Sequence, residues 1–177
     1  MAERTARLRP VEGSDLAFTR ENRNDPAINT GTLGRRFPIT EVGEREWFDS
    51  LGRGTPPRSV VFTVVSSDDP APRGLVQLDE IDWIHRTAWF GLWIGSAYHG
   101  QGLGRSATEL MLRYAVRLNL RRLHLWVVAS NAPALDMYRS CGFVEEGARR
   151  GAILERGSEV DVVLMGRGLN GLSSDEG

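Results

Sequence analysis

The sequence predicts an α/β protein with a central mixed, mostly antiparallel sheet of about seven strands, flanked by about four helices. Runs of β-branched or alternating apolar residues, typical of strands, occur in both halves of the chain. Between them lie segments with apolar residues three or four positions apart, as in helices that cover a sheet. The 177 residues suit one domain. We expect it over residues 1–167, with a flexible Gly-, Ser- and acid-rich tail over 168–177.

The first fifty residues predict one short strand and two helices. The strand covers residues 6–9 and ends at a proline. Ser14 or Asp15 can cap the first helix, which an Asn-Asp-Pro sequence later breaks. The second helix begins at Thr40, and its first turn is rich in glutamate, which suits the positive end of a helix dipole.

The middle of the chain predicts a meander of three antiparallel strands. Val60–Val65 is a β-branched run, and Gly74–Ile81 follows it after a turn rich in Asp and Pro. The third strand is Thr87–Ile94. Its residues alternate between two faces, with Ala88, Phe90, Leu92 and Ile94 on one face and Trp89, Gly91 and Trp93 on the other.

The second half predicts a β-α-β unit followed by a helix and a closing strand pair. A helix beginning after Gly104 has one apolar stripe, which predicts burial against the sheet. Leu123–Val128 is the next strand, and a short helix near residues 133–140 ends at Gly142. Residues 143–147 and 160–165 then read as an antiparallel pair.

Composition narrows the class of protein. A net charge of −1 argues against a nucleic-acid partner. No run of about 18 apolar residues predicts a membrane span, and the first residues lack the apolar core of a signal peptide, so we expect a cytoplasmic protein. The single cysteine, Cys141, is expected to be a small buried residue. Three scattered histidines have no metal-ligand spacing, so no metal is expected.

A glycine-rich turn, Gly100-Gln101-Gly102-Leu103-Gly104, lies between the third meander strand and the central helix. Glycines let backbone N–H groups approach a ligand, and a helix N-terminus carries unpaired N–H donors, so the segment suits a phosphate. Arg105 in the first helical turn could add a charged contact. A tight turn with no ligand is the alternative. A P-loop is excluded because the chain has no lysine, and the glycine spacing is wrong for a dinucleotide site.

Two ordered segments resemble the GNAT superfamily of N-acetyltransferases. His99–Gly104 is similar to that family's pyrophosphate loop, although His99 stands where the family has Gln or Arg. Asn131–Phe143 is similar to the Asn-x-x-Ala-x-x-x-Tyr-x-x-x-Gly-Phe segment that follows one strand later. Gly74–Ile81 resembles the meander of the branch that contains the ribosomal-protein N-terminal and spermidine acetyltransferases.

The resemblance implies a GNAT fold and an enzyme that moves an acetyl group from acetyl-CoA to an amine. In the family the third meander strand parts from the next strand, and the pantetheine arm fills the gap. The cofactor-binding residues it implies are Leu92, Trp93, Ile94, His99, Gly100, Gln101, Gly102, Leu103, Gly104, Arg105, Asn131, Ala134 and Tyr138.

The resemblance also suggests catalytic residues. Tyr138 matches the tyrosine that donates a proton to the CoA sulfur, although a tyrosine on a helix can simply pack on the core. Asn131 could cap its helix, bind the cofactor or do both. Related enzymes often carry a glutamate where this chain has Trp89, so Glu80, at the end of the previous strand, is the expected base. A solvated hairpin end is the alternative for Glu80, and a water chain is the alternative base.

The acceptor stays open at this level. Candidates are a small-molecule or peptide amine: a protein N-terminus, a polyamine, an antibiotic or an amino-sugar nucleotide. Another donor such as succinyl-CoA, or a non-catalytic acyl-CoA-binding module, remains an alternative, and a homodimer is possible. Four tryptophans could shape an acceptor pocket, with Asn29 and Thr30 beside them: Trp47, Trp83, Trp89 and Trp93.

Overall fold

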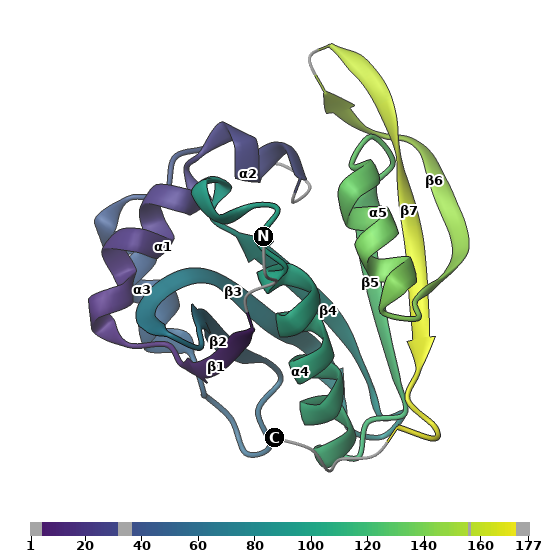
Figure 1. Cartoon of the computed structure of the whole chain (residues 1–177), viewed down its shortest axis with the longest axis horizontal. Coiled ribbons are helices and arrows are strands. Elements are labelled where there is room, and N and C mark those ends of the chain that lie inside the picture. The colour runs from purple at the N-terminus through teal and green to yellow at the C-terminus, as the bar shows by residue number, and fades with distance from the viewer. Residues whose placement is uncertain (1–4, 32–36, 156, 173–177) are drawn as a thin grey trace.

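The computed structural model describes residues 5–31, 37–155 and 157–172. Its seven strands form one sheet in the order β1-β2-β3-β4-β5-β7-β6 (Figure 1). All neighbours are antiparallel except β4 and β5, which are parallel. The predicted mixed, mostly antiparallel sheet is therefore confirmed. The strands are β1 (Ala6–Pro10), β2 (Val60–Ser66), β3 (Asp69–Asp82), β4 (Thr87–Ile94), β5 (Arg122–Val128), β6 (Val144–Glu155) and β7 (Ser158–Gly168).

Helices pack on both faces of β4. Gly104 of α4 comes close to Leu92 and Ile94 on one face. On the other face, Phe18 of α1 stacks on Trp93, with ring centroids 5.9 Å apart. The alternation predicted for this strand is therefore confirmed. The helices of the described residues are α1 (Leu16–Arg23), α2 (Pro26–Gly31), α3 (Glu41–Ser50), α4 (Leu103–Arg117) and α5 (Ala132–Ser140).

Capping residues and turn glycines in the sequence predicted where several of these helices begin and end. Thr40 caps α3 by accepting a hydrogen bond from the Gly43 N–H at 3.1 Å, and Gly142 ends α5 with a φ of 81°. Two features differ from the sequence prediction. The first helix ends at the predicted break, but a helix that was not predicted, α2, begins at Pro26. The closing pair is longer than predicted, because β6 and β7 form a long hairpin beyond α5 (Figure 1).

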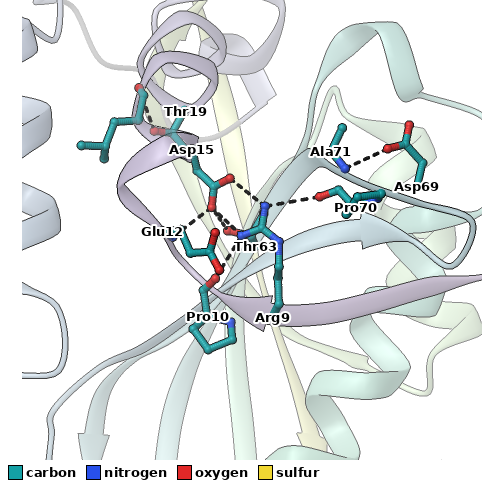
Figure 2. A network of polar contacts seen from close by, with 10 residues as sticks. Arg9, Pro10, Glu12, Asp15, Thr19, Thr63, Asp69, Pro70 and Ala71 are labelled. Carbon is teal, nitrogen blue, oxygen red and sulfur yellow. Dashed lines mark hydrogen bonds and ion pairs between the residues drawn. The ribbon is translucent and has the colours of Figure 1, made fainter.

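Asp15 does not cap α1, contrary to one sequence prediction. Its buried carboxylate instead accepts two hydrogen bonds from Arg9, at 2.7 and 2.8 Å, and one from the Thr63 hydroxyl at 2.9 Å (Figure 2). The Glu12 N–H adds a fourth bond at 3.0 Å. Burial would raise the pKa of Asp15, but these hydrogen bonds outweigh it and hold the pKa below its usual value. The network ties the start of α1 to β1 and β2.

The core lies between the sheet and helices α4 and α5. The predicted stripe of α4 is buried at Ala107, Met111 and Ala115, and Cys141 is buried as expected. Leu169 is also buried and Leu172 packs against the core, so the chain stays on the core over the first five residues of the predicted tail, 168–172. Residues 173–177 of that tail lie outside the described part of the chain, and their flexibility stays a prediction.

Candidate active site

The sheet opens between β4 and β5. Along β3, β4 is paired from Asp79↔Trp89 to Gly74↔Ile94. Towards β5, the parallel pairing ends at Trp89↔His124. Within the described residues, Phe90–Ile94 therefore has one edge with no strand against it, and β4 and β5 diverge there (Figure 1). This is the opening that the family resemblance implied. Its unpaired N–H and C=O groups suit a ligand that carries amide groups.

The glycine-rich loop joins this open strand to α4. Gly100 and Gly102 have φ values of 73° and 82°, in the left-handed region that favours glycine. Gly102 immediately precedes the helix, no side chain caps it, and the first turn holds no acidic residue. The N–H groups of Leu103 and Gly104 are therefore left without intrahelical partners at the positive end of the helix dipole. This arrangement suits a phosphate group.

Three side chains predicted to contact the cofactor have contacts within the protein. His99 Nε2 lies 2.8 Å from the Ile94 carbonyl oxygen, and because a carbonyl only accepts, the ring donates and ties the loop to β4. Gln101 donates to a carbonyl of the preceding turn at 3.4 Å, while its Oε1 is buried with no partner among the described residues. Arg105 pairs with Glu109 at 3.0 Å. Contact of these side chains with the cofactor stays a prediction.

Asn131 begins α5. Its Oδ1 accepts a hydrogen bond from the Ala134 N–H at 3.3 Å, so the capping role that the sequence left open is shown. The cap positions α5 and with it Tyr138, two turns further along. A cofactor contact of Asn131 or Ala134 is compatible with this cap and stays a prediction.

Tyr138 is buried where β4 leaves β5. Its ring centroid is 6.0 Å from that of Phe90, the first unpaired residue of β4, and 5.8 Å from that of Phe143. Its hydroxyl forms no hydrogen bond with the described residues. Burial, with the Cys141 thiol adding to it, raises the pKa of Tyr138 well above its usual value. Tyr138 therefore stays protonated at physiological pH, as a proton donor must.

Three aromatic side chains gather on the opposite face of the sheet, where the pairing of β4 with β5 ends. The rings of Trp89 and Trp126 are stacked, with centroids 5.4 Å apart, and His124 lies beside Trp89 at 5.5 Å. Burial, together with Arg122 and Arg121, lowers the pKa of His124, which keeps its ring neutral at pH 7. The sequence did not single out Trp126, because its place beside Trp89 depends on the pairing of β4 with β5.

The other three tryptophans predicted to shape an acceptor pocket have partners elsewhere. Trp93 stacks on Phe18, Trp47 lies under the Arg23 guanidinium at 4.8 Å, and Trp83 donates to a backbone carbonyl at 2.9 Å. Asn29 lies on α2, and the side chain of Thr30 is outside the described part of the structure.

Two carboxylates lie at the end of β3. Glu80 is exposed and has a φ of 48°, at the bulge that follows Asp79. Asp79 is half-buried, pairs with Trp89 across the strands and accepts a hydrogen bond from the Gln77 side chain. Burial raises the pKa of Asp79; the Gln77 hydrogen bond opposes this rise and the neighbouring Glu80 charge adds to it. The sequence placed Asp79 beside Glu80 but could not show that it is the desolvated member.

Within the described residues, no three His, Cys, Asp or Glu side chains are grouped as a metal site would require. Among the helices of that same part of the chain, none combines the length and apolar character that crossing a membrane demands.

A family model described as an acetyltransferase (GNAT) domain matches residues 6–144. The spermidine N(1)-acetyltransferase of Escherichia coli (strain K12) is 33% identical over 146 residues, which are 81% of this chain and 75% of that protein. That of Vibrio cholerae is 43% identical over 75 residues, 42% of this chain and 43% of that protein. The second match thus spans less than half of either protein.

Solved structures show the same fold. The chain is similar to a crystal structure of a spermidine N-acetyltransferase from Vibrio cholerae in complex with CoA and spermine. The TM-score is 0.85, with 28% identity over 93% of this chain and 96% of that one. The predicted GNAT fold, the acetyltransferase class and the branch that contains the ribosomal-protein N-terminal and spermidine acetyltransferases are confirmed.

Proposed function

Because the chain belongs to the GNAT acetyltransferase family, we propose that it transfers an acetyl group from acetyl-CoA to a primary amine, with a polyamine as the first acceptor to test. The observation that carries this proposal is the open edge of Phe90–Ile94 beside the uncapped N-terminus of α4. The similarity of the chain to spermidine N-acetyltransferases supports spermidine as an acceptor. A small-molecule or peptide amine is the wider acceptor class.

The residues of the opening suit the two chemical parts of acetyl-CoA. The loop from Gly100 and the first turn of α4 offer backbone N–H groups to the pyrophosphate. Phe90–Ile94 offers its unpaired edge to the amides of the pantetheine arm, with Leu92, Trp93 and Ile94 contributing backbone groups. The bound thioester supplies the acyl group, and no metal is required for its transfer.

Tyr138 acts as the acid in this proposal. It lies against Phe90, where the strands part, and donates its hydroxyl proton to the sulfur as the C–S bond breaks. The burial that raises the pKa of Tyr138 would also raise the pKa of a thiol beside it, so the pKa values of the two groups stay matched. A carboxylate at the end of β3, Glu80 or Asp79, takes the proton of the incoming ammonium group.

An acetyl-CoA titration followed by an acceptor screen tests the proposal. A ligand at 100 times its Kd stabilises a protein by about 2.7 kcal/mol, so we expect a clear rise in Tm with acetyl-CoA. The screen measures free CoA with spermidine, spermine, amino acids, N-terminal peptides and aminoglycosides. Stabilisation without turnover of any amine would instead indicate an acyl-CoA-binding module, and no stabilisation would remove the site.

Several further properties stay proposals. We place the enzyme in the cytoplasm, as a homodimer that needs no nucleic acid, membrane or metal ion. The net charge of −1 supports the absence of a nucleic-acid partner. Activity that survives dialysis against EDTA would support the absence of a metal, and a mass measured in solution would test the dimer.

A further inference from the structure

We propose that Asp79, rather than Glu80, is the general base, and that Gln77 positions it. This inference rests on the proposed function and names the residue that takes the acceptor proton. It starts from the strand pairing, which brings Asp79 opposite Trp89, the last residue of β4 that is still paired with β5. Asp79 therefore lies beside the point where the sheet opens.

The path of the acyl donor ends at the same point. An extended arm that starts at the N-terminus of α4 and follows β4 from Ile94 to Phe90 covers four residue steps, or about 13 Å. Beyond Phe90 the strands are joined again at Trp89↔His124, so the arm can go no further along the sheet. The reacting end of the donor therefore lies near Phe90 and Trp89.

Two side chains approach this point from opposite faces of the sheet. Tyr138 packs on Phe90 from the α5 side. Asp79 shares the face of its partner Trp89, because directly paired residues of antiparallel strands point to the same side. The acid and the base thus lie on opposite faces of the strand that holds the donor, so one can serve the leaving sulfur and the other the incoming amine.

Gln77 holds the Asp79 carboxylate in place. A Cβ at Gly91 would lie 3.0 Å from Gln77 Cγ, so the Gln77 side chain lies across the space that glycine leaves. From there its Nε2 donates to Asp79 Oδ2. Within the described residues the other carboxylate oxygen, Oδ1, has no hydrogen-bond partner, and Asp79 forms no ion pair. That oxygen is left to accept from an ammonium group.

The surroundings favour proton transfer at Asp79. Burial raises the pKa of this carboxyl, and Glu80 adds to the rise, so Asp79 is a stronger base than an exposed aspartate. The neighbouring strands β2 and β4 carry no titratable side chain. Of the helices that contact β3, α1 carries Arg20, Glu21 and Arg23, and α4 carries Arg105, Glu109, Arg113 and Arg117. Beside the partner Trp89 lies His124 of β5, which faces Glu146 of β6 at 3.7 Å.

The proposed step balances. Asp79 takes one proton from the acceptor ammonium group, and the neutral amine attacks the carbonyl carbon of the thioester. The C–S bond breaks, the sulfur receives a proton from Tyr138, and the nitrogen loses its second proton to solvent, from which Tyr138 is reprotonated. The products are the amide, the CoA thiol and one proton.

The test compares Asp79→Asn with Glu80→Gln, using spermidine as the acceptor and acetyl-CoA as the donor. Asp79→Asn should lower kcat/KM for spermidine at pH 7 by about 10² to 10³-fold, while the KM for acetyl-CoA and the Tm stay close to wild type. Glu80→Gln should keep kcat/KM for spermidine, the KM for acetyl-CoA and the Tm close to their wild-type values. Aminoacetonitrile, a primary amine largely unprotonated at neutral pH, should show a much smaller loss, because it arrives without the proton that Asp79 removes.

Gln77→Met gives a second readout that keeps the carboxylate and does not depend on Asp79→Asn folding. The lost hydrogen bond stabilises the charged form of Asp79, so its loss raises the pKa of Asp79. The acid limb of the pH profile of kcat/KM should therefore move to higher pH.

Three results would overturn the base assignment: a loss carried by Glu80→Gln, an equal loss of Asp79→Asn with both amines, or an unmoved acid limb in Gln77→Met. If wild-type protein bound acetyl-CoA but acetylated neither amine, the proposed function would fail first, and the base assignment with it.

Discussion

The two halves of β4 differ in what lies beside them. Thr87–Trp89 has a strand on each edge, while Phe90–Ile94 has β3 on one edge and, within the described residues, no strand on the other. The same strand is thus structural over its first part and available to a ligand over its second. The difference arises because β5 keeps its pairing with β7 along Arg122–Val128 while it leaves β4. An open edge is costly in the free protein, and a ligand that pairs with it recovers that cost.

The largest effect is expected from a substitution at Tyr138, beside the point where the two halves of β4 meet. Tyr138→Phe should lower kcat by about 10² to 10⁴-fold, because it removes the proton donor beside Phe90 and leaves the ring packing intact. Acetyl-CoA affinity, measured by calorimetry, should not change. Tyr114→Phe is the matched control, since Tyr114 packs on Phe62 of β2 at 4.9 Å, away from the opening. Near-wild-type turnover of Tyr138→Phe would remove this residue from the mechanism.

A change in the closed part of the sheet should cost stability and leave binding alone. Asp15→Ala leaves Arg9 without its carboxylate, and we expect a loss of about 3 kcal/mol in the free energy of unfolding, measured with urea. Asp136→Asn, an exposed carboxylate that also pairs with an arginine, should change this free energy little. A small loss in Asp15→Ala would show that the network in Figure 2 does not anchor α1.

The same network predicts a pH dependence. The folded-state pKa of Asp15 is lowered, so its contribution is fully present above the unfolded-state value of about 3.9. It is lost as the pH falls through the lower folded-state pKa. Wild type should therefore lose its advantage over Asp15→Asn in strong acid, and a constant difference between the two at every pH would contradict this.

A substitution in the glycine loop should have an intermediate effect, on the binding of acetyl-CoA at the open half of β4. Gly100→Ala places a side chain at a φ of 73°, and the left-handed conformation costs about 1 to 2 kcal/mol. If the loop adjusts to relieve this strain, its N–H groups move, and the KM for acetyl-CoA should rise about tenfold. Gly157→Ala, with a φ of 85° and equally open space in the β6–β7 turn, carries the same strain outside the loop. An equal change of KM in both variants would argue against a phosphate site.

The smallest effect concerns the cap of α5. Asn131→Ala should lower the free energy of unfolding by about 1 kcal/mol, as should Thr40→Ala at the cap of α3. We expect Asn131→Ala, and not Thr40→Ala, to raise the KM for acetyl-CoA by a few-fold, because α5 carries Tyr138 to the opening. An unchanged KM would assign Asn131 to the cap alone.

The parts of this site that the sequence predicted depend on short segments. The glycines from Gly100 to Gly104, the cap at Asn131 and the position of Tyr138 each follow from residues close together in the chain. The base could not be chosen in this way. Asp79 and Glu80 are adjacent, and only the pairing of β3 with β4 and the bulge after Asp79 show that one is half-buried and the other exposed.

By itself, the sequence determined the fold class, the order of the strands and the positions of the glycine loop, the α5 cap and Tyr138, because apolar periodicity, caps and glycine turns are local properties. Only the tertiary structure decided that Asp15 binds Arg9 and Thr63 instead of capping α1, and that His99 donates to Ile94. It also brought Trp126 beside Trp89 and Asp79 to the opening. These contacts depend on strand register and side-chain burial, which are set when segments distant in the sequence pack together.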